Sequence, residues 1–199
     1  MFTGIVQGVG TVRVIEARGG DITVVFDTAG VSLTDVELGG SIAVSGVCLT
    51  ATGFDASSFT ADVSRETLAL TTLGDAIVGS RVNLEKALLA GQALGGHYVT
   101  GHVDGVGRLV ARHDDGRSVR MEFQVPPDLA RYVARKGSIC IDGVSLTVNG
   151  ASRDRFDVNL VPHTLGVTTL GDLQSGDRVN LEVDIIARYV ERMMHPELD

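Results

Sequence analysis

An internal duplication constrains the fold of this chain more than any other feature. When the sequence is shifted by 97 positions, residues 3–86 align with residues 100–183 without a gap, and 31 of the 84 pairs are identical. Chance would give about one identity in seventeen for average composition. The strongest matches pair Gly40–Thr50 with Gly137–Thr147 and Arg81–Glu85 with Arg178–Glu182. The sequence therefore predicts two copies of one folding unit.

Each copy has the pattern of short β-strands separated by turns. Residues 22–26, 41–44 and 81–84 are rich in β-branched or alternating apolar residues, and residues 119–123 alternate strictly. Several short strands in so small a unit favour a closed barrel over an open sheet. A short helix is predicted over 127–135, where Pro127 opens the segment, and residues 88–96 are predicted to form a linker with a helical turn.

The chain is predicted to divide into a first barrel (1–96), a second barrel (97–184) and a C-terminal helix (185–199). The last segment has an apolar stripe at helical spacing, formed by Ile185, Ile186, Tyr189, Val190, Met193 and Met194. This stripe could pack on its own barrel. Because the first copy has no equivalent helix, self-association is the favoured role.

Charge and composition exclude several classes of protein. With 17 Lys and Arg against 25 Asp and Glu, the net charge is −8, and no basic run is present that would favour nucleic acid or an anionic membrane. No apolar run reaches the roughly 18 residues of a membrane helix. Cys48 and Cys140 form no disulfide framework, so a reducing cytoplasm is expected. The sequence contains no phosphate-binding loop and no zinc-ligand spacing, so no metal is predicted.

The positions at which the two copies differ in reactive type are the candidates for chemistry. Five aligned pairs differ in this way: Ile5 and His102, Gly39 and Lys136, Cys48 and Ser145, Asp62 and Asn159, and Ala87 and Asp184. The second copy thus carries His102, Lys136 and Asp184 at positions where the first copy has residues that do not ionise. We expect one copy to hold a reactant passively while the other supplies acid and base groups.

Each of these residues also has a purely structural interpretation. Cys48 could be a small buried apolar residue, and His102 could be a hydrogen-bonded surface histidine. Lys136 could be a solvated turn residue, and Asp184 could cap the terminal helix. Asn83 and Asn180 agree between the copies, which favours a shared structural or ligand bond. His97 could simply mark the junction between the copies.

Four motifs together resemble riboflavin synthase of the alpha-chain type, over essentially the whole chain. They are Met1–Val6, Gly46–Thr50, Gly95–His97 with Gly101–Val103, and Asp142–Thr147. The resemblance implies an all-β fold of two tandem six-stranded Greek-key barrels, of the riboflavin-synthase and flavin-reductase-like type, followed by an amphipathic helix. Two residues depart from the family pattern: Ser45 stands where asparagine is expected, and His163 stands where some relatives carry a carboxylate.

The resemblance also implies a reaction. Two molecules of 6,7-dimethyl-8-ribityllumazine dismutate by transfer of a four-carbon unit, giving riboflavin and 5-amino-6-(D-ribitylamino)uracil without a metal or redox cofactor. It implies a homotrimer joined through the terminal helices, with each active site between the first barrel of one subunit and the second barrel of its neighbour. An association with lumazine synthase is left open.

The family's functional positions are carried over by alignment. The first pocket is expected to contain Gly4, Ile5, Val6, Cys48, Leu49, Thr50, Asp62, Val63, Ser64, Arg65, Glu66 and Thr67. The second is expected to contain Gly101, His102, Val103, Lys136, Ser145, Leu146, Thr147, Asn159, Leu160, Val161, Pro162, His163 and Thr164. The catalytic candidates are His102 for proton transfer, with Ser145 and Asp184 beside it, together with Cys48 and Lys136.

Other functions fit the sequence less well. A lumazine- or flavin-binding antenna protein on the same fold would do no chemistry and should have lost reactive residues, yet Cys48, His102, Ser145 and Asp184 are all present. A nucleic-acid-binding barrel is disfavoured by the acidic charge and the 5% aromatic content. A flavin-dependent reductase would need a nicotinamide domain, for which the chain has no room.

Overall fold

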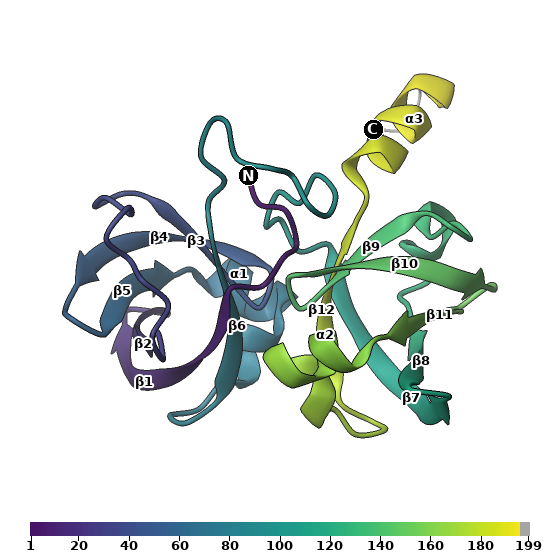
Figure 1. The fold of residues 1–199 in the computed structure, drawn as a ribbon. Coiled ribbons are helices and arrows are strands. Elements are labelled where there is room, and N and C mark those ends of the chain that lie inside the picture. The colour runs from purple at the N-terminus through teal and green to yellow at the C-terminus, as the bar shows by residue number, and fades with distance from the viewer. Residues whose placement is uncertain (196–199) are drawn as a thin grey trace.

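The two sequence repeats fold as two closed, six-stranded antiparallel β-barrels that lie side by side, as a computed structural model shows (Figure 1). The structure describes residues 1–195. The strand order is β1-β2-β5-β4-β3-β6 in the first barrel and β10-β11-β8-β7-β12-β9 in the second. Strands β3, β4 and β5 are consecutive, and β6 returns to pair beside β3, which is a Greek-key arrangement. The predicted fold class is confirmed.

The strands of the first barrel are β1 (Gly8–Arg18), β2 (Asp21–Asp27), β3 (Ser41–Val44), β4 (Val47–Phe54), β5 (Ser58–Val63) and β6 (Arg81–Lys86). Those of the second are β7 (Gly105–Asp115), β8 (Ser118–Gln124), β9 (Ser138–Ile141), β10 (Val144–Ala151), β11 (Arg155–Leu160) and β12 (Arg178–Val183). Between the last two strands of each barrel lie a short α-helix and a 3-10 helix: α1 (Arg65–Leu70) and η1 (Thr72–Asp75), and α2 (Pro162–Val167) and η3 (Thr169–Asp172). Each of these six strands and two short helices of the second barrel begins and ends 97 residues after its counterpart.

Equivalent phenylalanines fill the two barrel interiors. Phe26 stacks on Phe59 with ring centroids 5.1 Å apart, and Phe123 stacks on Phe156 at 5.6 Å. All four side chains are buried. Burial of one such side chain stabilises the fold by about 1.5–3 kcal/mol. The repeats therefore share their core as well as their strand order.

Two asparagines join the barrels to each other through reciprocal hydrogen bonds. Asn83 Nδ2 donates to the Asp142 carbonyl, and Asn180 Nδ2 donates to the Ser45 carbonyl, both at 2.8 Å. In return, Asn83 Oδ1 accepts from the Thr169 amide and Asn180 Oδ1 accepts from the Thr72 amide, also at 2.8 Å. Both side chains are buried. The agreement of the two copies at these positions therefore reflects a structural role in holding the barrels together.

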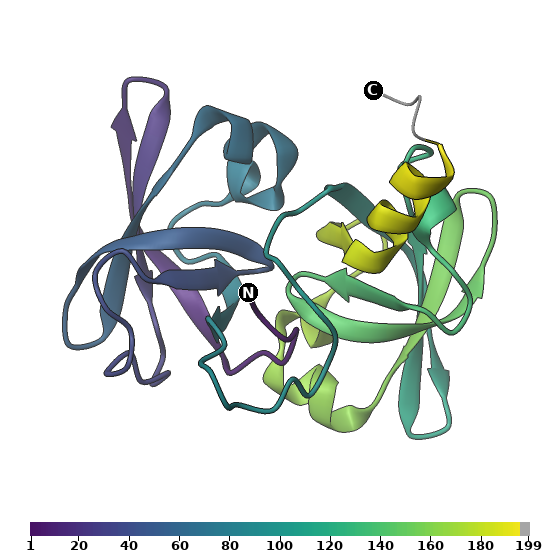
Figure 2. The same cartoon turned by 90° about the horizontal axis from the view of Figure 1, so that it is seen from above.

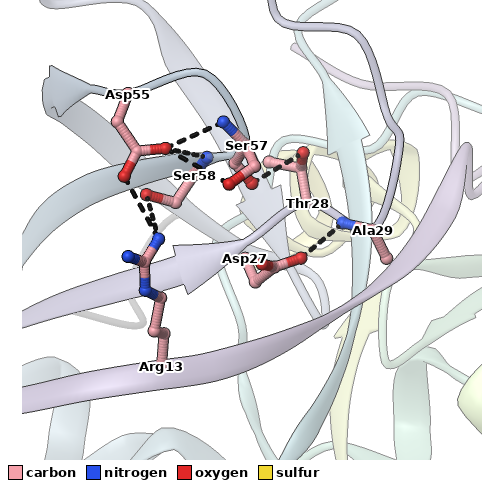
Figure 3. Close-up of polar contacts among 7 residues, drawn as sticks. All are labelled: Arg13, Asp27, Thr28, Ala29, Asp55, Ser57 and Ser58. Atoms are coloured by element: carbon pink, nitrogen blue, oxygen red, sulfur yellow. Dashed lines mark hydrogen bonds and ion pairs between the residues drawn. The ribbon is translucent and has the colours of Figure 1, made fainter.

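Polar side chains bond the turns of the first barrel that follow β2 and β4 (Figure 3). Asp55 accepts hydrogen bonds from the amides of Ser57 and Ser58, both at 2.8 Å, and forms an ion pair with Arg13 at 3.1 Å. These hydrogen bonds, together with Arg13, lower the pKa of Asp55 to about 2. The second barrel has Ser152 at the equivalent position, so the two outer turns are built differently.

The prediction of a helix over 127–135 is wrong. Only a 3-10 turn, η2 (Ala130–Tyr132), forms there. The chain becomes extended at Val133, and both Leu129 and Val133 are buried against the core of the second barrel. These two side chains pack on the barrel core, so their apolar spacing does not mark one face of a helix. Residues 88–96 contain a tight turn, in which Gln92 N donates to Leu89 O at 3.1 Å, and no helix.

The predicted C-terminal helix is present as α3 (Ile185–Met194), which extends away from the second barrel (Figures 1 and 2). Asp184 caps it, accepting a hydrogen bond from the Ile186 amide at 3.0 Å. On its polar side, Arg188 forms an ion pair with Asp104, and Glu191 bonds Arg131. Residues 196–199 of the predicted segment lie outside the described residues.

The apolar face of α3 has no partner within the described chain. None of the helix residues is buried, and the exposed apolar side chains are Ile186, Tyr189, Val190, Met193 and Met194. Among the residues described, no helix has the length and apolar character needed to cross a membrane.

Candidate active site

The segment that begins each repeat crosses to the other barrel. Gly101 O accepts a hydrogen bond from Cys48 N, and Gly4 O accepts one from Ser145 N, both at 2.8 Å. Val103 packs against the core of the first barrel, and Val6 packs against the core of the second. Grouping each segment with the pocket of its own repeat is therefore wrong. Gly101–Val103 lies beside Cys48, and Gly4–Val6 lies on the side of Ser145.

Glycine is required at both crossing points. Gly101 has φ +79°, and an added Cβ would lie 2.6 Å from Cys48 Cβ. Gly4 has φ +75°, and an added Cβ would lie 2.5 Å from Ser145 Cβ. A side chain at either position would combine an unfavourable backbone conformation with a clash. The two glycines therefore bring the crossing backbone into direct contact with the candidate reactive residues.

Two buried glutamates hold the crossing segments in place. Glu85 on β6 accepts hydrogen bonds from Thr3 N, Thr3 Oγ1 and Gly4 N at 2.7–3.0 Å. Glu182 on β12 accepts the same three bonds from Thr100 and Gly101 at 2.6–2.9 Å. Burial raises the pKa of both carboxyls, against the opposing effect of these bonds. Neither glutamate was predicted as a site residue, although both lie in the repeated Arg-Val-Asn-Leu-Glu motif.

The first barrel and the crossing segment enclose a cavity of about 310 Å³, which we term the Cys48 pocket. It is lined by Val47, Cys48, Glu66, Thr67, Leu70, Thr71, Gly101, His102 and Val103. Six of these residues were predicted to bind substrate. The Cys48 thiol is half-buried, and the exposed His102 side chain also borders an adjoining cavity that contains Glu182. The Cys48 pocket thus combines a thiol, an imidazole, a carboxylate and two hydroxyls.

Other residues predicted for the first site have different places. Leu49 and Val63 are buried in the barrel core, whereas Thr50, Asp62 and Arg65 are exposed. Ser64 caps α1 by accepting a hydrogen bond from Thr67 N at 3.2 Å, and the exposed Ile5 lies beside Gly95. The capping bond orients the helix that carries Glu66 and Thr67 into the pocket.

On the equivalent side of the second barrel, Ser145 is bonded to His97, which was not among the predicted site residues. Its Oγ lies 2.7 Å from His97 Nδ1. His97 is 9% exposed, and burial lowers its pKa, against the opposing charge of Asp184. The structure therefore places Ser145 with His97, and it places His102 with Cys48.

The remaining residues predicted for the second site lie along the strands and α2. Leu160 is buried, and Leu146 packs partly against the core. The exposed residues are Lys136, Thr147, Asn159, Val161, Pro162 and His163, whereas Thr164 is half-buried. Lys136 has φ +68° and its amide donates to Val148 O at 2.8 Å, so it forms a turn.

The chain resembles proteins of one family along its whole length. The lumazine binding domain family matches residues 3–87 and again residues 100–184. The riboflavin synthase of Mycobacterium bovis is 47% identical over 204 residues, covering 98% of both chains, and that of Photobacterium phosphoreum is 43% identical over 194 residues, covering 98% of this chain and 89% of the relative.

Solved structures show the same architecture. LumP complexed with 6,7-dimethyl-8-(1'-D-ribityl) lumazine has a TM-score of 0.82 at 28% identity, and LumP complexed with riboflavin has a TM-score of 0.83 at 29% identity. Each comparison covers 92% of this chain and 99% of the other. The matches in sequence and in both domains show that this chain belongs to the riboflavin synthase family and has two lumazine-binding domains.

Proposed function

We propose that this chain catalyses the dismutation of two molecules of 6,7-dimethyl-8-ribityllumazine. One molecule transfers a four-carbon unit to the other, and riboflavin and 5-amino-6-(D-ribitylamino)uracil together contain all the atoms of the two substrates. The observation that carries this proposal is the pair of equivalent sites with different reactive groups. One contains Cys48 and His102, and the other contains Ser145 bonded to His97.

His102 is our candidate for proton transfer. The 7-methyl group of the lumazine is acidic because the ring delocalises the anion that remains when the proton leaves. His102 borders the Cys48 pocket and remains exposed, so a ligand in that pocket can reach its imidazole. Cys48 is positioned to contact the same ligand. Asp184 caps α3, and its charge opposes the lowering of the His97 pKa by burial, so we assign Asp184 to the Ser145 side.

We further propose that the active chain is a homotrimer, with each active site formed by the first barrel of one subunit and the second barrel of its neighbour. Support comes from the exposed apolar face of α3, which five large side chains form. Apposing the two barrels would bring two substrates together in a reactive orientation. Sedimentation of this 20.9 kDa chain as a monomer would contradict the arrangement. Because both cysteines are free thiols, we propose a cytoplasmic location.

The test is to incubate the purified chain with 6,7-dimethyl-8-ribityllumazine alone and to follow the products by chromatography. We expect riboflavin and the pyrimidine in equal amounts, with two lumazines consumed for each riboflavin. Tight binding of lumazine without turnover would favour an antenna protein, as the likeness to ligand-bound LumP allows. If the chain neither bound nor converted lumazine, both functions would be overturned.

A further inference from the structure

His97 is a buried histidine that the proposed reaction does not yet use. It follows Gly95 and Gly96 in the linker between the barrels, and it is 9% exposed. Its Nδ1 lies 2.7 Å from Ser145 Oγ. Its Nε2 is buried and has no hydrogen-bond partner within the described part of the chain. Within the described chain, the imidazole therefore hydrogen-bonds to the Ser145 hydroxyl alone.

The surrounding backbone holds the imidazole in this position. His97 N donates to Thr3 O at 3.2 Å, within the segment that also carries Gly4 against Ser145. A Cβ added at Gly96 would lie 2.1 Å from Thr3 O and 3.0 Å from Ser145 Oγ. No side chain can therefore replace hydrogen at Gly96 without moving Ser145 or the crossing segment. The two glycines before His97 allow the close approach.

His97 is also the feature that most clearly distinguishes the two sites. In the described part of the chain, no histidine side chain is hydrogen-bonded to Cys48, the residue equivalent to Ser145. Cys48 occupies the position of Ser145 in the first repeat, and its amide makes the same bond to the crossing segment. The backbone frame is therefore shared, and the described chain has a buried imidazole hydrogen-bonded to the reactive side chain on the Ser145 side.

The unpartnered nitrogen indicates which tautomer is present. Burial lowers the pKa of His97, so its imidazole is neutral near pH 7 and carries one N–H. Nε2 has no partner in either tautomer, and a buried N–H without an acceptor is rarer in proteins than a buried acceptor without a donor. A proton on Nδ1 has an acceptor in Ser145 Oγ. The hydrogen of the serine hydroxyl is then available for another partner.

We propose that His97 is a positioning residue whose Nδ1–H donates to Ser145 Oγ and thereby directs the serine O–H toward the bound lumazine. This inference rests on the proposed reaction, since it assigns Ser145 a polar contact with that substrate. The role of His97 is exerted through Ser145, and the imidazole itself does not touch the substrate.

The test compares His97→Asn, His97→Ala, Ser145→Ala and the double alanine variant, with the exposed His113→Gln as a surface control. Asparagine retains a donor at the position of Nδ1, so its kcat should stay within about threefold of the parent. His97→Ala should lower kcat about tenfold with little change in KM. The double variant should lose no more than Ser145→Ala alone, because His97 acts through the serine. Multiplicative losses, or an asparagine variant no better than alanine, would overturn the proposal.

Two further measurements separate this proposal from its rivals. Thermal unfolding of each variant identifies losses that come only from misfolding, and His97→Asn should unfold near the parent temperature. Nitrogen-15 spectra of the histidine side chains, assigned with His97→Asn, should show a neutral imidazole protonated on Nδ1. Protonation on Nε2 would overturn the proposal, whether or not the chain converts lumazine. If the chain showed the expected tautomer but no turnover, the proposed reaction would be refuted, and the His97–Ser145 hydrogen bond would still stand.

Discussion

The two barrels have the same frame and different chemistry. Asn83 and Asn180 make matching bonds across the barrel interface, and Glu85 and Glu182 make matching bonds to the crossing segments. Cys48 and Ser145, by contrast, occupy equivalent positions with different reactive groups. Residues that agree between the repeats hold the scaffold, and residues that differ distinguish the sites. A duplicated fold can in this way bind two copies of one molecule and treat them differently.

The two barrels also exchange the segments that begin their repeats. The Cys48 pocket is built from the first barrel and the segment that begins the second repeat, and the bond from Ser145 to Gly4 repeats the crossing on the other side. His102 therefore belongs to the second repeat in sequence and to the Cys48 pocket in space. The Cys48 pocket would not be complete in an isolated barrel.

The largest predicted difference between the repeats concerns Asp142 and its counterpart Ser45. Both are buried with positive φ, and they accept hydrogen bonds from the Asn180 and Asn83 amides respectively. Burial raises the pKa of Asp142 from 3.8 to about 7. The folded state therefore favours the protonated acid. Its contribution to stability is complete below pH 3.8 and is lost as the pH rises through about 7.

Asp142→Asn should remove this pH dependence, because asparagine does not titrate and tolerates positive φ. The free energy of unfolding of the variant should rise relative to the parent by about 4 kcal/mol between pH 4 and pH 8, at about 1.36 kcal/mol per pKa unit. Urea unfolding at a series of pH values measures this difference. Ser45→Asn is the matched control and should shift stability equally at every pH. Parallel curves for Asp142→Asn and the parent would refute the assignment.

The second prediction concerns His102, which stands where the first repeat has Ile5. His102→Gln should lower kcat at least about 100-fold, in the range expected for loss of a general base, which corresponds to about 3 kcal/mol of barrier. Lumazine affinity, measured by fluorescence titration, should change only a few-fold. His113→Gln, an exposed histidine on β7, should leave turnover unchanged. Unaltered turnover in His102→Gln would remove the base assignment.

The smallest predicted effect concerns Glu85 and Glu182, which hold the segments that cross between the barrels. Glu85→Gln and Glu182→Gln should each destabilise the fold by about 2 kcal/mol, because the amide cannot accept all the bonds that the carboxylate accepts. Glu182→Gln should also speed alkylation of Cys48, since Glu182 holds the Gly101 segment against that thiol. Glu85→Gln should leave the alkylation rate unchanged. Equal rates in the two variants, measured by mass spectrometry, would show that the segments do not act separately.

Much of the frame could be predicted from sequence because it depends on local pattern. The repeat of 97 residues and the alternation in residues 119–123 were sufficient to predict two small barrels, and the apolar stripe after Asp184 was sufficient to predict α3. The same reasoning failed over residues 127–135. There the apolar spacing resembles a helix face, but Leu129 and Val133 are buried against the barrel core through a single 3-10 turn.

The composition of each site could not be read from residue spacing. The strand pattern follows from hydrogen bonding and side-chain alternation within about ten residues, so the chain carries that information locally. The crossing depends on how two finished barrels dock through Asn83 and Asn180, and on a backbone bond between Gly101 and Cys48, 53 positions apart by their residue numbers. The bond from His97 to Ser145 joins residues 48 positions apart, and the described residues contain no matching bond to Cys48. Repetition reveals what the two copies share, and long-range packing alone brings the unrepeated His97 to one of them.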